Sequence, residues 1–390
     1  MKKSLLTLSA ALFSAALSAA PAAPVAGAPE VKLLYSTIIN DTKVDALSPS
    51  SLTLTPEGHY LVTFVNQGDA GPGSVTFISR SKDYGRTWSQ PEQEFKPAHD
   101  RQGTCISLCN APDGSIFKIE NLLEYQYANL VPGKWGWRKS LIKLYRSTDG
   151  GKTFEFVEQL KSPQGSLAAD MAKIYQLNNG DWVIPAYCYN GGCSPLKTGF
   201  GSGWFRSTDG GKTWGEFEVI FKDVPPEGEK PYGFNESAFV IRPDGLTVGF
   251  VRNDTRKPKT QFRALSSDNG HTWTLPEDTR FPNVDIPLIT TLEDGKGYLM
   301  VGGNCGIYLR TVTFYWSKDG ISWQKIGEAF YQPDNRHRPM NSATGGCQSI
   351  IKGPGKHQYF VAFYAHDPKL PGRHKTRVEG NMVELVFPEK

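Results

Sequence analysis

A short motif with the pattern Ser-x-Asp-x-Gly-x-Thr-aromatic recurs along this chain of 390 residues. Full copies and one copy that is a residue shorter occupy residues 81–88, 147–154, 207–214, 266–273 and 317–323. Their first residues lie 51 to 66 positions apart. A repeat of this length is typical of an array of supersecondary units, each too small to bury its own apolar face.

The motif has the chemistry of a turn. Its Asp accepts backbone N–H groups across a tight reversal, its Gly supplies a positive φ, and the Thr-aromatic pair re-enters a strand. We therefore interpret these aspartates as structural and not catalytic. We expect the aromatic residue to pack between neighbouring units.

A second periodic signal, a glycine turn followed by an alternating apolar run, lies between the motif copies. The turn glycines are Gly58, Gly114, Gly180, Gly245, Gly295 and Gly355. The runs that follow predict strands at 59–64, 115–119, 181–187, 246–252, 297–301 and 358–364. Turn signals between alternating runs of this kind indicate β-hairpins.

Together the two signals predict an all-β, six-bladed β-propeller. Five of the six hairpins are followed by a copy of the motif 21 to 33 residues later, so each unit supplies two hairpins and one four-stranded blade. The sixth blade would combine an N-terminal strand at 31–39 with a C-terminal strand at 381–387. Ring closure by these two strands would remove exposed sheet edges.

The first 28 residues have the basic start, apolar stretch and Ala/Pro-rich end of a secretory signal peptide. Their apolar run is too short for a confident membrane span. We expect residues 29–390 to form one propeller domain, secreted or periplasmic, monomeric and without membrane insertion. The formal net charge of +4 includes Lys2 and Lys3 of this segment, so a nucleic-acid partner is not indicated.

The six cysteines show no Cys/His spacing of a zinc site, and we expect no metal and no cofactor. Cys188 and Cys193 bracket a Gly-rich loop, and in an exported chain they are candidates for a disulfide.

With these repeats the chain resembles the sialidase superfamily. Members of that superfamily are secreted propellers that carry the same repeats, which are called Asp-boxes. The resemblance covers essentially all of residues 29–390, and its most specific part is the segment 234–240, Phe-Asn-Glu-Ser-Ala-Phe-Val, followed by a hairpin and Arg252. It implies that Glu236 is a catalytic residue that supports a tyrosine. It also implies that Arg252 belongs to a triad that clamps a substrate carboxylate.

The chemistry of these two residues agrees with that interpretation. A Glu that opens an inner propeller strand and an Arg that closes the next one can both face a central funnel. Arginine offers a planar, bidentate fork to a carboxylate, and a carboxyl group with a raised pKa can transfer protons.

The resemblance also implies roles for Arg310, as a further triad arginine, and for Asp69, as the acid/base aspartate. The chain departs from the family at residues 48–52, which lack the first triad arginine, and at residues 345–350, which lack the nucleophilic tyrosine. We assign Gln348, in the second of these segments, to substrate binding.

Further candidates lie on the substrate side. Trp135 and Trp137 lie in the longest gap between a hairpin and its Asp-box, together with Glu124 and Tyr125, and aromatic residues on a loop there can stack on sugar rings. Asp170 precedes the strand that leads to the third glycine turn and is a further candidate for the central funnel.

Three functions stay open. The first is a secreted, sialidase-like exo-glycosidase that removes a terminal acidic sugar, with sialic acid favoured, from a glycan partner. In it, Tyr232 or Tyr364 would replace the missing tyrosine if the mechanism is retaining. The second is a polysaccharide lyase of uronate-containing glycans, for which His337 would be the base. The third is a propeller that binds glycans without chemistry. We favour the glycoside hydrolase.

Overall fold

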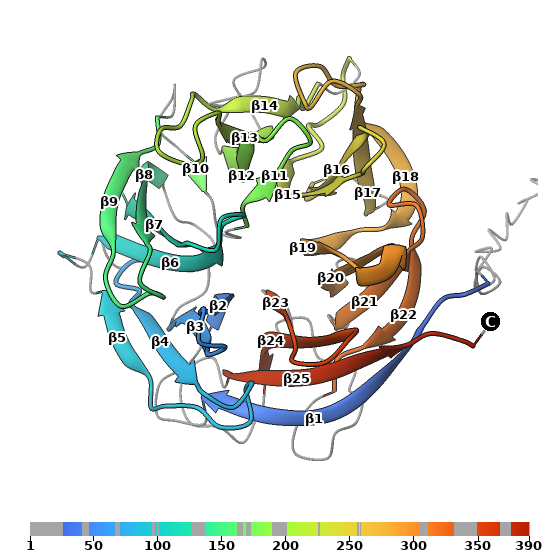
Figure 1. Ribbon diagram of the computed structural model, residues 1–390. Coiled ribbons are helices and arrows are strands. Elements are labelled where there is room, and N and C mark those ends of the chain that lie inside the picture. The colour runs from blue at the N-terminus through green and yellow to red at the C-terminus, as the bar shows by residue number, and fades with distance from the viewer. Residues whose placement is uncertain are drawn as a thin grey trace, which may run out of the picture.

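The alternating apolar runs form strands of 2 to 11 residues in the computed structural model. The structure describes residues 26–40, 47–66, 71–95, 98–99, 101–125, 137–161, 167–168, 173–188, 201–224, 227–255, 257, 259–304, 311–330, 349–366 and 376–389. Within these residues the strands form six sheets arranged as blades around a central axis (Figure 1). The predicted all-β, six-bladed propeller is confirmed.

The first three blades follow one another along the chain, each starting at the axis. Blade one consists of β2 (Leu47–Leu54), β3 (Tyr60–Val65), β4 (Thr76–Ser81) and β5 (Glu92–Phe95). Blade two consists of β6 (Gln102–Asn110), β7 (Ile116–Tyr125), β8 (Trp137–Ser147) and β9 (Glu155–Gln159). Blade three consists of β10 (Leu167–Ala168), β11 (Tyr175–Gln176), β12 (Trp182–Cys188), β13 (Gly201–Ser207) and β14 (Glu218–Phe221).

The other three blades complete the ring. Blade four consists of β15 (Phe234–Ile241), β16 (Thr247–Asn253), β17 (Thr260–Ser266) and β18 (Glu277–Pro282). Blade five consists of β19 (Val284–Thr291), β20 (Tyr298–Asn304), β21 (Val312–Ser317) and β22 (Gln324–Glu328), with the 3₁₀ turn η2 (Glu293–Gly295) between β19 and β20. Blade six consists of β23 (Ser349–Lys352), β24 (Gln358–His366), β25 (Thr376–Val386) and β1 (Glu30–Asn40).

The seam of the ring lies in blade six, where the two ends of the chain meet. β1 pairs with β25 in antiparallel register from Glu30 opposite Val386 to Asn40 opposite Val378. The expected closure by the N- and C-terminal strands is confirmed, and β25 begins five residues before the predicted strand at 381–387. Residues 1–25, which are most of the expected signal segment, lie outside the described residues. No helix in the described part of the chain is long and apolar enough to cross a membrane.

The predicted strand after each glycine turn is present, but the second one is longer than expected. β7 runs to Tyr125, so Glu124 and Tyr125 lie in a strand and not in a loop. Tyr125 is buried against Val65 and Leu123, because the strand continues alternating past the hairpin. It is therefore not an exposed platform for sugars.

Each Asp-box closes the turn between the third and fourth strands of its blade. In the third copy, Ser207 Oγ donates to Asp209 Oδ1 at 2.8 Å, while Thr213 N–H and Thr213 Oγ1 donate to the two oxygens of Asp209 at 3.0 and 2.7 Å. In the second copy, hydrogen bonds from Thr153 and Ser147 lower the pKa of Asp149. A carboxylate held in its charged form by its own turn acts as a structural group, as the sequence predicts.

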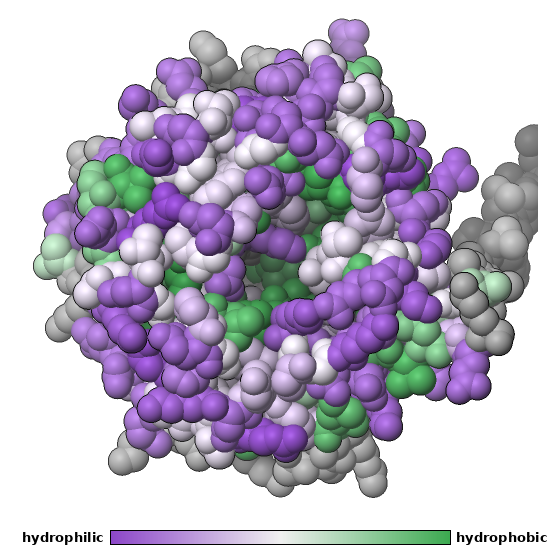
Figure 2. Space-filling view, in the orientation of Figure 1, coloured by the Kyte–Doolittle hydropathy of each residue, from purple (hydrophilic) through white to green (hydrophobic). Residues whose placement is uncertain are grey.

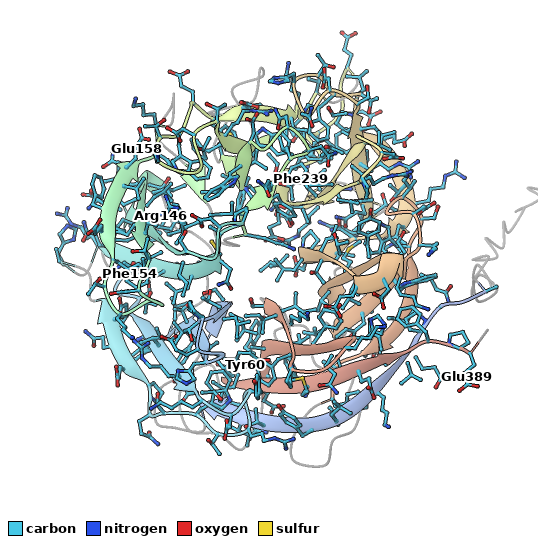
Figure 3. The ribbon with its side chains drawn as sticks, viewed as in Figure 1. Tyr60, Arg146, Phe154, Glu158, Phe239 and Glu389 are labelled. Atoms are coloured by element: carbon cyan, nitrogen blue, oxygen red, sulfur yellow. The ribbon has the colours of Figure 1, made fainter. Side chains whose placement is uncertain are left out.

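Contacts between blades pass through the last positions of the Asp-boxes. Trp273 of blade four packs on Trp204 of blade three with ring centroids 5.3 Å apart, and Trp323 of blade five packs on Phe250 of blade four at 5.8 Å. Inner strands contribute as well, since Phe239, labelled in Figure 3, packs on Trp204 with ring centroids 4.8 Å apart. The aromatic residue thus packs between neighbouring units as expected.

The meander gives the ring two different faces. The turn after each inner strand and the Asp-box turn lie at the same end of the blade, because successive antiparallel strands reverse direction. We call this end the Asp-box face, and Figure 1 looks onto it with η2 in front. The inner strands begin, and the second strands end, at the opposite face.

The close packing at the Asp-box glycines predicts a difference between two Gly→Ala variants. Gly245 and Gly270 both have a positive φ, +92° and +79°, but only at Gly270 would a Cβ collide with a neighbour, Cζ2 of Trp204, at 2.3 Å. Gly245→Ala should cost about 1 kcal/mol through backbone strain alone. Gly270→Ala should cost about 1–3 kcal/mol more through overpacking.

Urea unfolding monitored by tryptophan fluorescence measures both changes. Gly245→Ala is the matched control, since no atom lies within 4 Å of the position that its new methyl group would occupy. Equal loss of stability in both variants would contradict the view that the Asp-box glycine is required by the preceding blade.

Candidate active site

A cluster of charged side chains lies at the face opposite the Asp-boxes, where blades four and five meet. Glu236 is the third residue of inner strand β15, and Arg252 is the last but one residue of β16, which pairs with β15. Asp285 is the second residue of the next inner strand, β19. Asp254 directly follows β16. The cluster thus draws on three strand ends from two blades.

The guanidinium of Arg252 is the centre of the cluster. Its Nη1 lies 2.8 Å from Glu236 Oε1 and 2.8 Å from Asp285 Oδ1. Its Nη2 donates to Asp254 Oδ1 at 2.8 Å. The side chain of Asp285 is 5% exposed and that of Glu236 is 9% exposed, whereas that of Asp254 is 35% exposed. Asp254 therefore lies on the open side of the cluster.

The backbone between the two blades holds this arrangement in place. The Asn283 side chain accepts from the N–H of Asn253 at 3.0 Å and donates to its C=O at 2.9 Å, which ties the end of β16 to the residue before β19. Ile286 has a φ of 49°, an uncommon conformation for a β-branched residue, at a register irregularity of β19. Its N–H donates to Glu236 Oε2 at 2.9 Å.

Strain of this kind persists only where the surrounding structure enforces it, and it concentrates at functional sites. Here the unusual conformation of Ile286 directs a backbone donor at a carboxylate. Both oxygens of Glu236 are then occupied, one by Arg252 and one by Ile286. The carboxyl group of Glu236 is held in a single orientation.

The electrostatics of Glu236 suit proton transfer. Burial is the main cause that raises its pKa to about 7, and the neighbouring Asp285 acts in the same direction, while Arg252 and the Ile286 N–H oppose it. Protonated and ionised forms are then both populated near neutral pH. That balance is what a general acid or base requires.

Of the residues that the sequence singles out, the structure brings Glu236 and Arg252 together. Several others lie outside the described residues: Asp69, Trp135, Asp170, Arg310, Gln348 and His337. Trp137 begins β8, and its side chain is also outside the description. The roles proposed for all of these stay predictions.

The alternative tyrosines and the cysteines have defined places. Tyr232 stacks on Phe234 with ring centroids 5.1 Å apart, and Tyr364 is buried on β24. Cys188 is disulfide-bonded, and its partner lies outside the described residues, where Cys193 is also found. The pairing of Cys188 with Cys193 stays a prediction.

Two carboxylates of the cluster, Asp285 and Asp254, are not among the residues predicted from the sequence. A signal for Asp285 exists, because it opens the inner strand of blade five much as Glu236 opens that of blade four. Asp254 stands two positions after Arg252 and belongs to the same strand end. To predict such a cluster, one would have to compare the first residues of the inner strands in neighbouring blades.

Comparisons with known proteins agree with this architecture. Among solved structures, a Dyadobacter fermentans protein of unknown function matches with a TM-score of 0.70 and 18% identity, over 92% of this chain and 100% of that one. A Hadza microbial sialidase matches with a TM-score of 0.61 and 14% identity, over 90% and 67% of the two chains. A Fusarium graminearum α-L-arabinofuranosidase matches with a TM-score of 0.54 and 14% identity, over 92% and 98%.

At these identities the likeness concerns the fold. A search of curated proteins finds no match. The family model described as BNR repeat-like domain matches residues 125–328, which includes the second to fifth Asp-boxes and the charged cluster around Arg252. The chain therefore belongs to the BNR repeat-like family and has the six-bladed fold of the sialidase-like superfamily.

Proposed function

We propose that the chain is a glycoside hydrolase that removes a terminal sugar from a glycan at the cluster around Arg252. The observation that carries the proposal is the buried carboxyl of Glu236, whose pKa of about 7 lets it give and take a proton, with a second carboxylate, Asp285, on the same guanidinium. The likeness in fold to sialidases and to an arabinofuranosidase supports it.

Each side chain has a role in this chemistry. Glu236 in its protonated form would protonate the leaving oxygen, and in its ionised form it would activate the incoming water. Glycoside hydrolysis passes through a transition state with oxocarbenium character, which carries positive charge. Asp285 and Asp254 place negative charge beside Arg252, and such charge stabilises that transition state.

The favoured substrate is a sialoside, as the sequence resemblance implies. A sialic acid carries a carboxylate, and the partly exposed Asp254 is the group that such a carboxylate would replace on Nη2 of Arg252. The approach would come from the open side of the cluster. Glu236 and Asp285 would keep their contacts with Nη1.

A neutral sugar is the second candidate, and the charge of the described cluster favours it. Three carboxylates surround a single guanidinium, so an anionic substrate meets like charges unless a group outside the described residues offsets them. The arabinofuranosidase of Fusarium graminearum shares the fold over nearly its full length. A terminal pentofuranoside is therefore the neutral substrate to test first.

The activity prediction concerns Glu236 and Arg252. Purified protein lacking residues 1–28 is incubated with a fluorogenic sialoside and, separately, with an aryl α-L-arabinofuranoside. One of the two should release its fluorophore or aryl group, and Glu236→Gln and Arg252→Met should each lower kcat/KM at least about a hundredfold, the usual loss when a proton-transfer or charge-stabilising group is removed.

Glu216→Gln is the matched control, because Glu216 is an exposed carboxyl in the segment after the third Asp-box. It should leave kcat/KM unchanged. Turnover that survives Glu236→Gln would refute the assigned role of Glu236. Release from neither substrate would turn attention to uronate-containing polysaccharides, where an unsaturated, ultraviolet-absorbing product would identify a lyase.

The protonation of Glu236 also predicts how stability depends on pH. The pKa of Glu236 is about 7 in the folded chain and that of an unfolded glutamate is roughly 4.3, so its contribution is complete below about pH 4 and is lost as the pH rises through 7. The free energy of unfolding of the wild type, measured relative to Glu236→Gln, should fall by roughly 1–3 kcal/mol between pH 4 and pH 8.

Urea titrations at several pH values measure this difference. The same subtraction with the exposed Glu155→Gln serves as the control and should give a flat curve. A flat curve for Glu236→Gln would show that folding leaves the pKa of Glu236 unchanged, which would remove the basis for acid catalysis near neutral pH.

A further inference from the structure

The ring also has a central opening on the Asp-box face. This opening lies at the opposite end of the inner strands from Glu236 and Arg252. Figure 2 shows a hollow at the centre of this face, with hydrophobic residues inside it and mainly hydrophilic residues around it. Two adjoining cavities, of about 210 and 460 Å³, are lined there by residues at the ends of inner strands, among them Asn110, Thr290 and Lys352.

The walls of the smaller cavity are partly apolar and partly polar, and the polar part comes from Asn110, Thr290, Ser349 and two lysines. Leu52, Ile174, Leu288, Ile350 and Ile351 contribute aliphatic side chains from several blades. Tyr359 adds an aromatic ring. The apolar part of the wall is suited to a compact hydrocarbon body, because aliphatic side chains offer few partners to water.

A single lysine projects charge into both cavities. Lys173, which precedes β11, lines the two of them and is mostly buried. Its Nζ donates to the C=O of Ile289 and lies 4.9 Å from the centre of the Tyr175 ring. Burial lowers its pKa to about 8, so the amine still carries its charge in most molecules at neutral pH.

Nothing in the described lining balances that charge. Neither cavity is lined by a described Asp or Glu, and no described carboxylate forms an ion pair with Lys173. The other lysine of the lining, Lys352, is already paired with Glu293. An ammonium that has one carbonyl acceptor among the described residues keeps donors for further partners, and burial of an unpaired charge is costly.

We propose that this mouth of the channel binds a small organic monocarboxylate, with its carboxylate on Lys173 and its apolar body against Ile174 and Leu288. The anion supplies the charge that the described lining does not provide. The site is separate from the proposed active site, since it lies on the opposite face and uses none of the same residues.

The size and lining of the cavity define the class of ligand. A volume of about 210 Å³ is roughly seven times the share of one water molecule in the liquid, which suits an acid of about seven to ten non-hydrogen atoms. Inorganic phosphate is a poorer match, because it has no apolar body to cover the aliphatic part of the wall.

Benzoate is a suitable probe, and its binding to protein that comprises residues 29–390 is followed by calorimetry and by saturation-transfer NMR. We expect a Kd of about 1 mM or below, in keeping with a ligand of about nine heavy atoms. Lys173→Met should weaken binding at least tenfold. Lys212→Met, which removes an exposed lysine of the third Asp-box, should leave the Kd unchanged.

Benzyl alcohol and inorganic phosphate complete the test. Benzyl alcohol keeps the ring but lacks the charge, and phosphate keeps the charge but lacks the ring, so both should bind at least tenfold more weakly than benzoate. Equal binding of either compound, or unchanged benzoate binding by Lys173→Met, would overturn the proposal. Absence of benzoate binding to the wild type would overturn it as well.

The wild type alone also decides the location, should Lys173→Met fail to fold. Intermolecular NOEs from the benzoate ring to the methyl groups of Ile174 and Leu288 are expected. NOEs only to residues around Arg252, where another cation is present, would place the anion at the opposite face and contradict the assignment. Loss of glycosidase activity has no bearing on this result.

Discussion

Packing between consecutive blades is the interaction on which the rest of the structure depends. A four-stranded sheet of this size cannot bury its own apolar face, so each blade uses the side chains of the preceding one. The Asp-box brings a glycine and an aromatic residue to that junction. Gly270 lies so close to Trp204 that no side chain fits, and Trp273 covers the same ring. The motif recurs along the chain because each blade needs this contact with the preceding one.

The two ends of the central channel carry side chains of different charge. At the face opposite the Asp-boxes, three carboxylates surround Arg252, and a strained backbone at Ile286 fixes Glu236. At the Asp-box face, the described lining contains Lys173 but no acid. The inner strands therefore connect an acid-rich opening with a cationic, partly apolar one.

The sequence predicts the fold well because its signals are local. Each turn glycine and each Asp-box is recognised from a few consecutive residues, because the turn itself requires those residue types. The positions of the six hairpins follow from these turns. The length of β7 was not predicted, because a strand that continues past a hairpin has no marker at its end. Glu236 and Arg252 were found because the segment that contains both of them resembles a sialidase motif on paired strands of one blade. Asp285 was missed because it reaches Arg252 from the next blade.

Other features could not be read from the sequence for physical reasons. The positive φ of Ile286 contradicts the preference of a β-branched residue, so only the surrounding structure can impose it. In the sequence, Lys173 has no feature that distinguishes it from a surface lysine. Its burial depends on the inner strands of several blades that surround it in the folded chain. Candidates such as Asp69 and Arg310 lie outside the described residues, so their predicted roles rest on the resemblance alone.

The register of the seam has a mechanical consequence. Glu30, at the start of β1, lies opposite Val386, at the end of β25, so the chain enters and leaves the ring at the same end of one strand pair. A force that pulls the two termini apart loads the backbone hydrogen bonds of this pair one after another, as in opening a zipper, and not all at once. The seam would therefore yield at a lower force than a pair loaded in shear, and blade six would open before the other blades.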